Sequence, residues 1–316
     1  MVKCLDQYHD DYLSAYNGDC VDVINAVPDD TVHLSVFSPP FADLYSYSDS
    51  PRDMGNCKDY AEFFEHFGVL VEQLLRVTMP GRICAVHCMD IPSMKERDGV
   101  IGVKDFSGDI IRCFASFGWV YHSRTLIWKD PLIEATRTKA IGLMHKQLCK
   151  DSTMSRCGLP DYMLAFRKPG ENPLPVSHPD GLTDYFGSED PGGVGIKRSH
   201  NIWRAYASPV WMDVRQTLTL SKANARDEKD EKHVCPLQLD TIMRAVTLWS
   251  NPGDVVLTPF MGVGSEVYGA VKLGRRGVGI ELKPSYYRQA VKNLQRLRHD
   301  QTSNAEQPSL LDALTE

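Results

Sequence analysis

The pattern of apolar and polar positions predicts short strands that alternate with helices. Seven short apolar runs have the length and composition of strands, at residues 16–19, 32–38, 83–88, 125–129, 162–167, 255–258 and 277–281. Apolar residues recur at helical spacing in four other stretches, at residues 61–78, 237–249, 265–273 and 285–298. Because strands that alternate with helices form parallel sheets covered on both faces, the sequence predicts a doubly wound, mostly parallel α/β fold.

One stretch interrupts this alternation. Residues 170–232 are rich in Pro, Gly and Ser, which favour turns and loops, so they are expected to form an insertion or a small separate lobe. The chain after His299 is polar and acidic, and we expect residues 301–316 to be a flexible tail.

Length and composition place the chain among ordinary globular proteins. It has 316 residues, of which 42% are hydrophobic and 24% charged, and this excludes collagenous, fibrous and disordered classes. No run approaches the roughly 20 apolar residues that cross a bilayer, and the first residues lack the apolar core of a secretory signal. We therefore expect no membrane association and a cytoplasmic location.

The cysteines predict buried thiols rather than a metal site. There are nine, at scattered spacing and without a CxxC pair. Cys84 and Cys88 fall in the apolar run ICAVHC, where alternation directs both to one face of a buried strand. In a reducing compartment such thiols pack as small hydrophobic groups, so we expect no metal.

Charge is distributed unevenly along the chain. The formal net charge is −6, yet residues 124–168 contain nine Lys or Arg against four acidic residues. Residues 195–226 contain six Lys or Arg against one acidic residue, Asp213. Segregated basic stretches on an acidic protein are compatible with binding of nucleic-acid phosphates. Solvated loops that happen to be basic are the open alternative.

The strand at 32–38 runs into Ser38-Pro39-Pro40-Phe41, a segment suited to binding a donor group. Ligands of open α/β sheets bind at the carboxyl ends of strands. Two prolines remove two N–H donors and stiffen the turn, which leaves the Ser38 hydroxyl and nearby carbonyls as acceptors. The exocyclic amino group of a nucleobase is such a donor, and the ring of Phe41 offers a stacking face. A proline-rich turn without function is the alternative.

A second strand end predicts a nucleoside site. The strand at 255–258 leads into Phe260, Gly262 and Gly264 and then a helix, so the backbone there can approach a ligand closely. The strand at 277–281 ends in Glu281, a carboxylate suited to accept hydrogen bonds from ribose hydroxyls. Val267 stands where the dinucleotide fingerprint requires a third glycine. This favours a nucleoside without pyrophosphate over a nicotinamide dinucleotide.

Together these motifs resemble the β group of S-adenosylmethionine-dependent DNA amino-methyltransferases. In that group the catalytic tetrapeptide precedes the cofactor loop, a circularly permuted order that residues 38–41 and 260–264 follow here. The similarity covers roughly residues 14–168 and 233–298 and is closest to orphan enzymes of phages and prophages. It implies a seven-stranded Rossmann-like sheet, a catalytic domain at 1–168 and 233–300, and target-recognition segments at 129–160 and 169–232.

The resemblance also implies roles for individual residues. Ser38, Pro39, Pro40 and Phe41 correspond to the catalytic motif. Cofactor binding is assigned to Asp19, Cys20, His233, Pro236, Thr258, Pro259, Phe260, Gly262, Gly264 and Glu281. For Asp19 a turn or helix-cap role stays open. Candidate DNA-binding residues are Tyr45, Lys129, Arg137, Lys139, Lys146, Lys150, Lys197, Arg198 and Arg204.

Two residues depart from the family pattern. Thr258 stands where an Asp usually precedes Pro-Phe, which puts one contact to the cofactor's amino group in doubt. The tetrapeptide begins with Ser38, which family habit associates with cytosine-N4, whereas prophage-type relatives are often adenine enzymes. We place adenine-N6 ahead and leave cytosine-N4 open, because a hydroxyl accepts a hydrogen bond from either amino group.

The expected reaction transfers a methyl group to the amino nitrogen of a base in double-stranded DNA. Ser38 and the Pro39 carbonyl accept the two amino hydrogens and favour a tetrahedral nitrogen that attacks the sulfonium methyl. The target base has to leave the duplex. We expect a homodimer. Open alternatives are an RNA or protein methyltransferase, a cofactor-binding regulator without catalysis, and a nicotinamide oxidoreductase.

Overall fold

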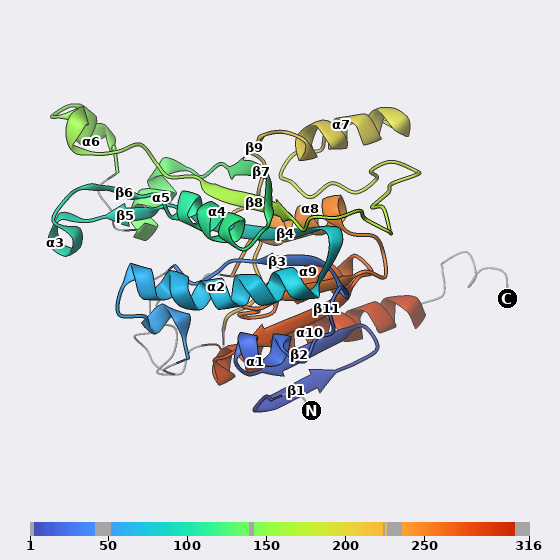
Figure 1. Cartoon of the computed structure of the whole chain (residues 1–316). Coiled ribbons are helices and arrows are strands. Elements are labelled where there is room, and N and C mark those ends of the chain that lie inside the picture. Colours follow the sequence, from blue (N-terminus) through green and yellow to red (C-terminus); the bar gives the residue numbers. More distant parts are fainter. Residues whose placement is uncertain (1–2, 42–51, 139–141, 224, 226–235, 307–316) are drawn as a thin grey trace.

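The computed structural model describes residues 3–41, 52–138, 142–223, 225 and 236–306. Within this part of the chain one nine-stranded sheet runs through the molecule, in the order β1-β2-β11-β10-β3-β4-β8-β7-β9 (Figure 1). Its strands are β1 (Asp6–His9), β2 (Leu13–Asn17), β3 (Val32–Phe37), β4 (Thr78–Met89), β7 (Val120–Ile127), β8 (Asp161–Arg167), β9 (Val210–Trp211), β10 (Val255–Thr258) and β11 (Arg276–Glu281). Each of the seven expected strands overlaps one of these, but two are shifted: the strand expected at 16–19 is Leu13–Asn17, and the strand expected at 125–129 is Val120–Ile127. β1 and β9 are added at the two edges.

The direction of the strands defines one functional edge. β2, β11, β10, β3 and β4 pair in parallel, whereas β8 is antiparallel to both β4 and β7. The carboxyl ends of the parallel strands therefore meet at one edge, together with the first residue of β8. This edge lies on the left of Figure 1. The mostly parallel, doubly wound fold is confirmed.

Helices cover both faces of the sheet (Figure 1). One face carries α1 (Cys20–Ile24), α2 (Tyr60–Val77) and α4 (Phe106–Ser116), and the other carries α8 (Leu239–Trp249), α9 (Ser265–Lys272) and α10 (Pro284–Glu306). Shorter elements are η2 (Met54–Asn56), α3 (Lys95–Asp98), α5 (Pro131–Thr138), α6 (His145–Leu148), η3 (Ser152–Met154), and a two-stranded sheet of β5 (Ile91–Ser93) and β6 (Gly102–Lys104). None of the described helices is long and apolar enough to cross a membrane.

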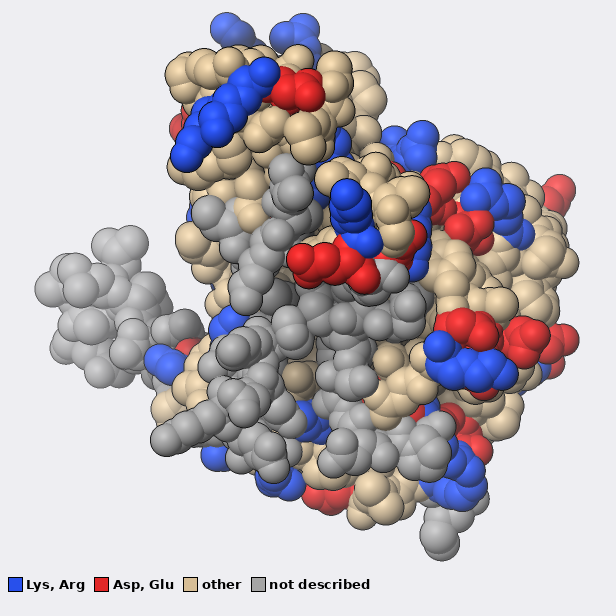
Figure 2. All heavy atoms as spheres, turned by 90° about the vertical axis from the view of Figure 1, so that its left-hand side faces the viewer, with Lys and Arg blue, Asp and Glu red and all other residues tan. Residues whose placement is uncertain are grey.

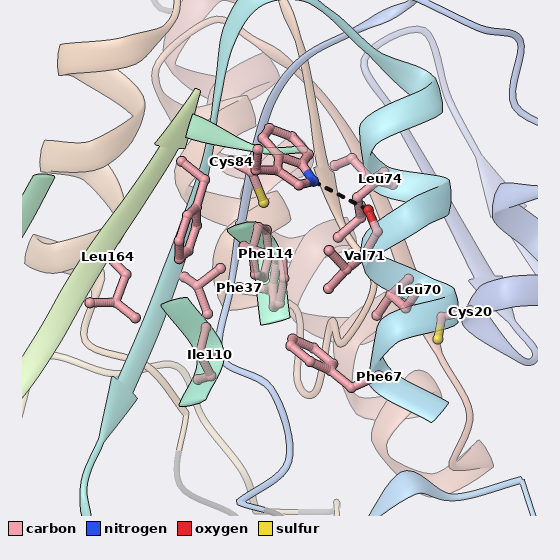
Figure 3. Close-up of a cluster of buried hydrophobic side chains, with 14 of the residues drawn as sticks. Cys20, Phe37, Phe67, Leu70, Val71, Leu74, Cys84, Ile110, Phe114 and Leu164 are labelled. Atoms are coloured by element: carbon pink, nitrogen blue, oxygen red, sulfur yellow. Dashed lines mark hydrogen bonds between the residues drawn. The ribbon is translucent and has the colours of Figure 1, made fainter. Parts of the chain in front are cut away.

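Alternation along β4 builds both halves of the core. Cys84 and Cys88 join a cluster with α2 and α4, as their spacing predicts, whereas Ile83 and Ala85 face the cluster around α8. Figure 3 shows Phe67, Leu70 and Leu74 of α2, Phe114 of α4, and Cys84 gathered in the first cluster. Since each strand in the middle of the sheet is buried on both faces, the apolar runs there are nearly continuous.

The boundaries of α2 follow from its sequence. The Asp59 carboxylate caps the first turn by accepting hydrogen bonds from the amides of Ala61 (3.1 Å) and Glu62 (2.9 Å). The helix ends at Val77, before Pro80 and Gly81. The end of the chain differs from expectation, because α10 continues to Glu306 and residues 301–306 are helical where a flexible tail is expected. No Pro or Gly after Pro284 interrupts that helix.

The insertion is attached to the sheet by a buried arginine. Arg244 of α8 is 0% exposed and donates hydrogen bonds to both carboxylate oxygens of Asp213 (3.2 and 3.0 Å) and to the carbonyl of Phe186 (2.9 Å). Its guanidinium also lies 4.8 Å from the ring centre of Tyr206 and 4.9 Å from that of Trp211. Tyr206 ends α7 (Ile196–Tyr206), a helix of this insertion.

We expect Arg244→Leu to lower the free energy of unfolding by about 3 kcal/mol, because the substitution leaves Asp213 and a buried carbonyl without their partner. Urea unfolding followed by circular dichroism measures this change. Arg112→Leu is the matched control, since Arg112 pairs with Asp109 on the surface, and its transition midpoint should equal that of the wild type. If Arg244→Leu and Arg112→Leu had equal urea midpoints, Arg244 would not contribute to attaching the insertion.

Candidate active site

The predicted cofactor and catalytic segments meet at the carboxyl edge of the sheet. β10 pairs with β3 on one side and with β11 on the other, so the loop after Thr258 lies between residues 38–41 and Glu281. β11 in turn pairs with β2, whose end leads into Asp19. Four strand ends thus bring together residues that are up to 262 positions apart in the sequence.

The glycine loop after β10 has the open backbone that a ligand site requires. Gly262 has a φ of +54°, and apart from Gly262 itself and its chain neighbours, no atom of the described residues lies within 4 Å of the position where its Cβ would stand. Gly264 has a φ of +95° and is the N-cap of α9. A side chain at Gly262 would be strained and would fill the open space, which explains why glycine suits this position.

Glu281 fixes the loop and keeps acceptor capacity. Its Oε2 accepts a hydrogen bond from the Gly262 amide (2.8 Å), and its Oε1 accepts one from the Lys283 amide (2.9 Å). Burial raises the pKa of Glu281 to about 7, although these two amides act in the opposite direction. Each carboxylate oxygen has a second lone pair, so the group can also accept hydrogen bonds from ligand hydroxyls.

Glu266 is a buried carboxyl group beside this loop. It lies in the first turn of α9 and is 4% exposed. Burial raises its pKa to about 8, and the negative charge of Glu281 contributes to the shift. Sequence reasoning passed over Glu266. The available signal was the one charged residue in the stretch between Gly262 and Ala270.

Asp19 is a helix cap at the end of β2. Its Oδ1 accepts hydrogen bonds from the amides of Val21 (2.9 Å) and Asp22 (3.1 Å), which is the structural role left open by the sequence. Its Oδ2 lies 3.8 Å from Nη1 of Arg52. The neighbouring Cys20 is buried, and this burial raises the pKa of its thiol. Cofactor binding by Asp19 and Cys20 stays a prediction.

The remaining cofactor candidates differ in their surroundings. Thr258 is 1% exposed, and its hydroxyl has no hydrogen-bond partner among the described residues, so the residue that replaces the usual Asp is a buried and unsatisfied polar group. Pro259 is buried, and Phe260 packs edge-on against Phe37 with 5.8 Å between ring centres. Pro236 is half-buried and lies three residues before α8. His233 lies outside the described residues.

The catalytic tetrapeptide follows β3 directly. Ser38, Pro40 and Phe41 are partly exposed, whereas Pro39 is buried. The ring of Phe41 is tilted against Phe106, with 6.0 Å between centres, so one part of this side chain belongs to the core cluster. Tyr45 lies outside the described residues.

A chain of polar contacts leads from Ser38 into the protein. The Ser38 Oγ lies 3.3 Å from His87 Nδ1, and His87 Nε2 lies 3.1 Å from Asp161 Oδ2. The other oxygen of Asp161, Oδ1, lies 2.5 Å from Lys129 Nζ. Burial tends to raise the pKa of Asp161, but its contacts with His87 and Lys129 together hold this pKa below its ordinary value.

His87 and Asp161 were missed as site residues from the sequence. His87 is the one polar side chain in the run ICAVHC, and Asp161 directly precedes the apolar strand segment YMLAF. Lys129 was expected to contact phosphates, but it is paired with Asp161 and its side chain is only 17% exposed. A polar residue inside or next to a buried strand is the signal that identifies such contacts.

The other basic candidates lie in different places. Lys146 in α6 and Lys150 just after it are exposed, as are Lys197 and Arg204 of α7. Arg198 pairs with Asp190 at 2.6 Å. The side chain of Arg137 and the whole of Lys139 are not among the described residues. Figure 1 shows α6 at the same side as the carboxyl edge and α7 toward the opposite side.

The face that contains this edge is shown in Figure 2. Lys and Arg side chains stand on its uppermost part, with fewer Asp and Glu among them. Within the described part of the chain, no group of three or more His, Cys, Asp or Glu side chains is arranged to hold a metal ion.

The raised pKa values of Glu266 and Glu281 predict how the stability of the fold depends on pH. A folded-state pKa above the unfolded value means that the native state binds more protons, so stability falls as the pH rises from about 5 to above 8. Glu266→Gln imitates the protonated form and should melt at a higher temperature than the wild type at pH 8.5, but at the same temperature at pH 5. Thermal unfolding across this range measures the difference. Glu72→Gln, on the exposed face of α2, should match the wild type throughout; a Glu266→Gln profile parallel to that of the wild type would contradict the assignment.

Comparisons with known proteins identify the family and the fold of the chain. A family model described as DNA methylase, for N6 and N4 enzymes, matches residues 32–292. Type II methyltransferase M.BamHI of Bacillus amyloliquefaciens is 23% identical over 278 residues, which cover 87% of this chain and 56% of that protein. Type II methyltransferase M.MjaI of Methanocaldococcus jannaschii is 22% identical over 287 residues, which cover 83% of this chain and 84% of that protein. The chain thus spans little more than half of the first of these relatives.

Solved structures show the same fold. TTHA0409 of Thermus thermophilus, solved in complex with S-adenosyl-L-methionine, has a TM-score of 0.60 and 22% identity, covering 90% of this chain and 95% of that one. The PvuII DNA methyltransferase, described as cytosine-N4-specific, has a TM-score of 0.60 and 17% identity. The match covers 90% of this chain and 86% of that chain. With the family model matching most of the sequence, the chain belongs to the DNA methylase family of N6 and N4 enzymes.

Proposed function

We propose that the protein transfers a methyl group from S-adenosylmethionine to the exocyclic amino group of a base in double-stranded DNA. One observation carries this proposal: the pairing of β3 with β10 sets the Ser38–Phe41 segment beside the glycine loop and Glu281. A base amine held by the first segment would therefore face a nucleoside donor held by the second. TTHA0409, which has the same fold, was solved with this donor.

The chemistry follows from hydrogen-bond acceptors. The amino lone pair of adenine or cytosine is delocalised into the ring and is a weak nucleophile. When Ser38 and the Pro39 carbonyl accept its two hydrogens, the nitrogen becomes more tetrahedral and its lone pair points to the sulfonium methyl. The methyl group moves from sulfur to nitrogen, and the nitrogen then loses one proton. The bound donor supplies the electrophilic methyl; this chain supplies orientation and acceptors.

The described residues fit the donor. Gly262 leaves room at the loop, and the Glu281 carboxylate can accept hydrogen bonds from ribose hydroxyls. The buried hydroxyl of Thr258 has no partner within the described part of the chain and is free to bond to a ligand group. Pro236 and His233, which precede α8, are proposed to cover the methionine end of the donor.

The target base and its route to the site are finer parts of the proposal. We keep adenine-N6 ahead of cytosine-N4, although the cytosine-N4-specific PvuII enzyme shares the fold. A base inside a duplex cannot reach Ser38 at the sheet edge, so we infer that it is flipped out of the helix. Phe41 would stack on the extruded base. Homodimerisation also stays a prediction.

Two other functions rest on weaker grounds. An RNA methyltransferase would use the same amino chemistry, and a cofactor-binding regulator would keep the glycine loop but lack turnover. Incubation with tritiated donor and either duplex DNA or RNA of the same sequence separates these possibilities. We expect label in DNA. Label in RNA alone, or donor binding without transfer to either polymer, would overturn the proposed function.

Ser38→Ala should reduce the rate of methyl transfer by at least about 10²-fold, the effect of removing one positioned transition-state hydrogen bond. Phe41→Leu should reduce it as well, since the leucine keeps the contact with the core but offers no ring for stacking. Single-turnover assays with duplex DNA give the rates, and calorimetry with the donor should show unchanged affinity in both variants. Wild-type transfer by Ser38→Ala would show that the tetrapeptide is not catalytic.

Phosphate contacts are expected from the basic residues on the side of the active site. The double variant Lys146→Ala/Lys150→Ala should bind DNA more weakly, and the slope of log affinity against log salt should become shallower by about 2. Lys197→Ala/Arg204→Ala, with the same loss of charge on α7, is the comparison. Fluorescence anisotropy at several salt concentrations measures both. If neither slope changes, or only the α7 variant changes, α6 does not contact the DNA backbone.

A further inference from the structure

Three side chains behind Ser38 form a buried polar array that the family resemblance does not explain. The side chains of His87 and Asp161 are 9% and 3% exposed, and the amine of Lys129 closes the array on the far side. They come from three different strands or strand ends: β4, the start of β8, and the residue two positions after β7. Burying an imidazole, a carboxylate and an amine together is costly unless each satisfies another.

The contacts on the two sides of the His87 ring determine which of its nitrogens carries the proton. The negative charge of Asp161 lies 3.1 Å from His87 Nε2 and favours the tautomer that carries its proton on that nitrogen, although the two groups are not aligned as a hydrogen bond. His87 Nδ1 then presents a lone pair to the Ser38 hydroxyl at 3.3 Å. A hydroxyl that donates to Nδ1 keeps both oxygen lone pairs for an incoming donor. Ser38 is thereby prepared as an acceptor for a base amine.

Lys129 keeps the carboxylate ionised. A buried carboxylate without a cation would tend to take up a proton, and a protonated Asp161 would cease to select the tautomer of His87. The amine of Lys129 lies 2.5 Å from Oδ1, on the side of the carboxylate away from His87. The lysine therefore acts on Ser38 through Asp161 and His87.

We propose that His87, Asp161 and Lys129 are positioning residues that hold the Ser38 hydroxyl as an acceptor and receive the proton released by the methylated amine. The proposal rests on the proposed function. As the nitrogen–carbon bond forms and the carbon–sulfur bond breaks, the sulfonium becomes a neutral thioether and the nitrogen becomes cationic. Its proton passes to Ser38 Oγ while the Ser38 proton passes to His87 Nδ1. The imidazolium lies against Asp161 and later gives its proton to water.

Variants of His87 and Asp161 separate positioning from structural support. His87→Gln places an amide near the former Nε2 and loses the contact to Ser38, whereas His87→Asn places one near the former Nδ1 and can still hold the hydroxyl. Asp161→Asn offers an N–H to Nε2, which favours the opposite tautomer and turns Nδ1 into a donor. We expect kcat to fall about 10²-fold in His87→Gln and Asp161→Asn, and less in His87→Asn, with KM for DNA and donor unchanged.

A second His–Asp pair in the same sheet serves as a control for the His87 variants. His33 at the start of β3 lies 3.5 Å from Asp254, so a similar His–Asp pair exists at the opposite, amino end of the strands. His33→Asn should leave kcat at the wild-type value. A fall in kcat in His33→Asn equal to that in His87→Gln would assign the effect to general loss of stability and would overturn the proposal.

A double-mutant comparison tests whether the residues act through Ser38. Because His87 acts only by way of the hydroxyl, Ser38→Ala/His87→Gln should be no slower than Ser38→Ala alone within about threefold. Multiplied losses in the double variant would contradict the proposal. If the wild type transfers methyl groups and Ser38→Ala does not, but His87→Gln and Asp161→Asn retain full kcat, the proposed function stands and this inference alone fails. Absence of transfer by the wild type would instead remove the proposed function.

Nitrogen-15 spectra of the histidine rings supply a readout without turnover. His87 resonances are identified by their loss in His87→Asn. We expect the Nε2–H tautomer in the wild type at neutral pH and the Nδ1–H tautomer in Asp161→Asn. An Nδ1–H tautomer in the wild type would overturn the proposal, whatever the kinetics show.

Discussion

The site depends on the parallel pairing of β10 with β3 on one side and β11 on the other. Parallel strands end at the same edge, so this pairing sets a proline-stiffened acceptor segment, a glycine loop and a carboxylate next to one another. The hydrogen bond from the Gly262 amide to Glu281 then fixes the loop relative to the neighbouring strand. Displacement of any one of these strands would separate the Ser38–Phe41 segment, the glycine loop and Glu281.

Buried charge is the second constraint on this edge. Glu266 and Glu281 are held close together at the proposed donor site, and Asp161 is enclosed between His87 and Lys129 at the proposed base site. Glu266 and Glu281 destabilise the fold when both are ionised, whereas the negative charge of Asp161 is compensated by a positive charge on Lys129.

The sequence was informative where chemistry follows a strict local pattern. The seven central strands and the main helices carry clear periodicity, and the tetrapeptide, the glycine loop and Glu281 follow strands directly. By contrast, α4 and α7 were not predicted, although Phe106, Ile110 and Phe114 of α4 recur at helical spacing. Gly108 within α4 and Gly195 before α7 favour turns, and both helices are short. The contact between Lys129 and Asp161 joins residues 32 positions apart, and local pattern does not reveal which buried charge pairs with which. The Ser38–His87 contact depends likewise on the register between β3 and β4.

The most direct test of the proposed function is to identify the methylated product. Duplex DNA is incubated with the protein and a donor whose methyl group carries three deuterium atoms, and the digested nucleosides are separated by mass spectrometry. We expect a deuterated methyl group on the exocyclic nitrogen of adenine or cytosine. Deuterium at carbon-5 of cytosine, or unlabelled DNA from a protein that binds the donor, would contradict it.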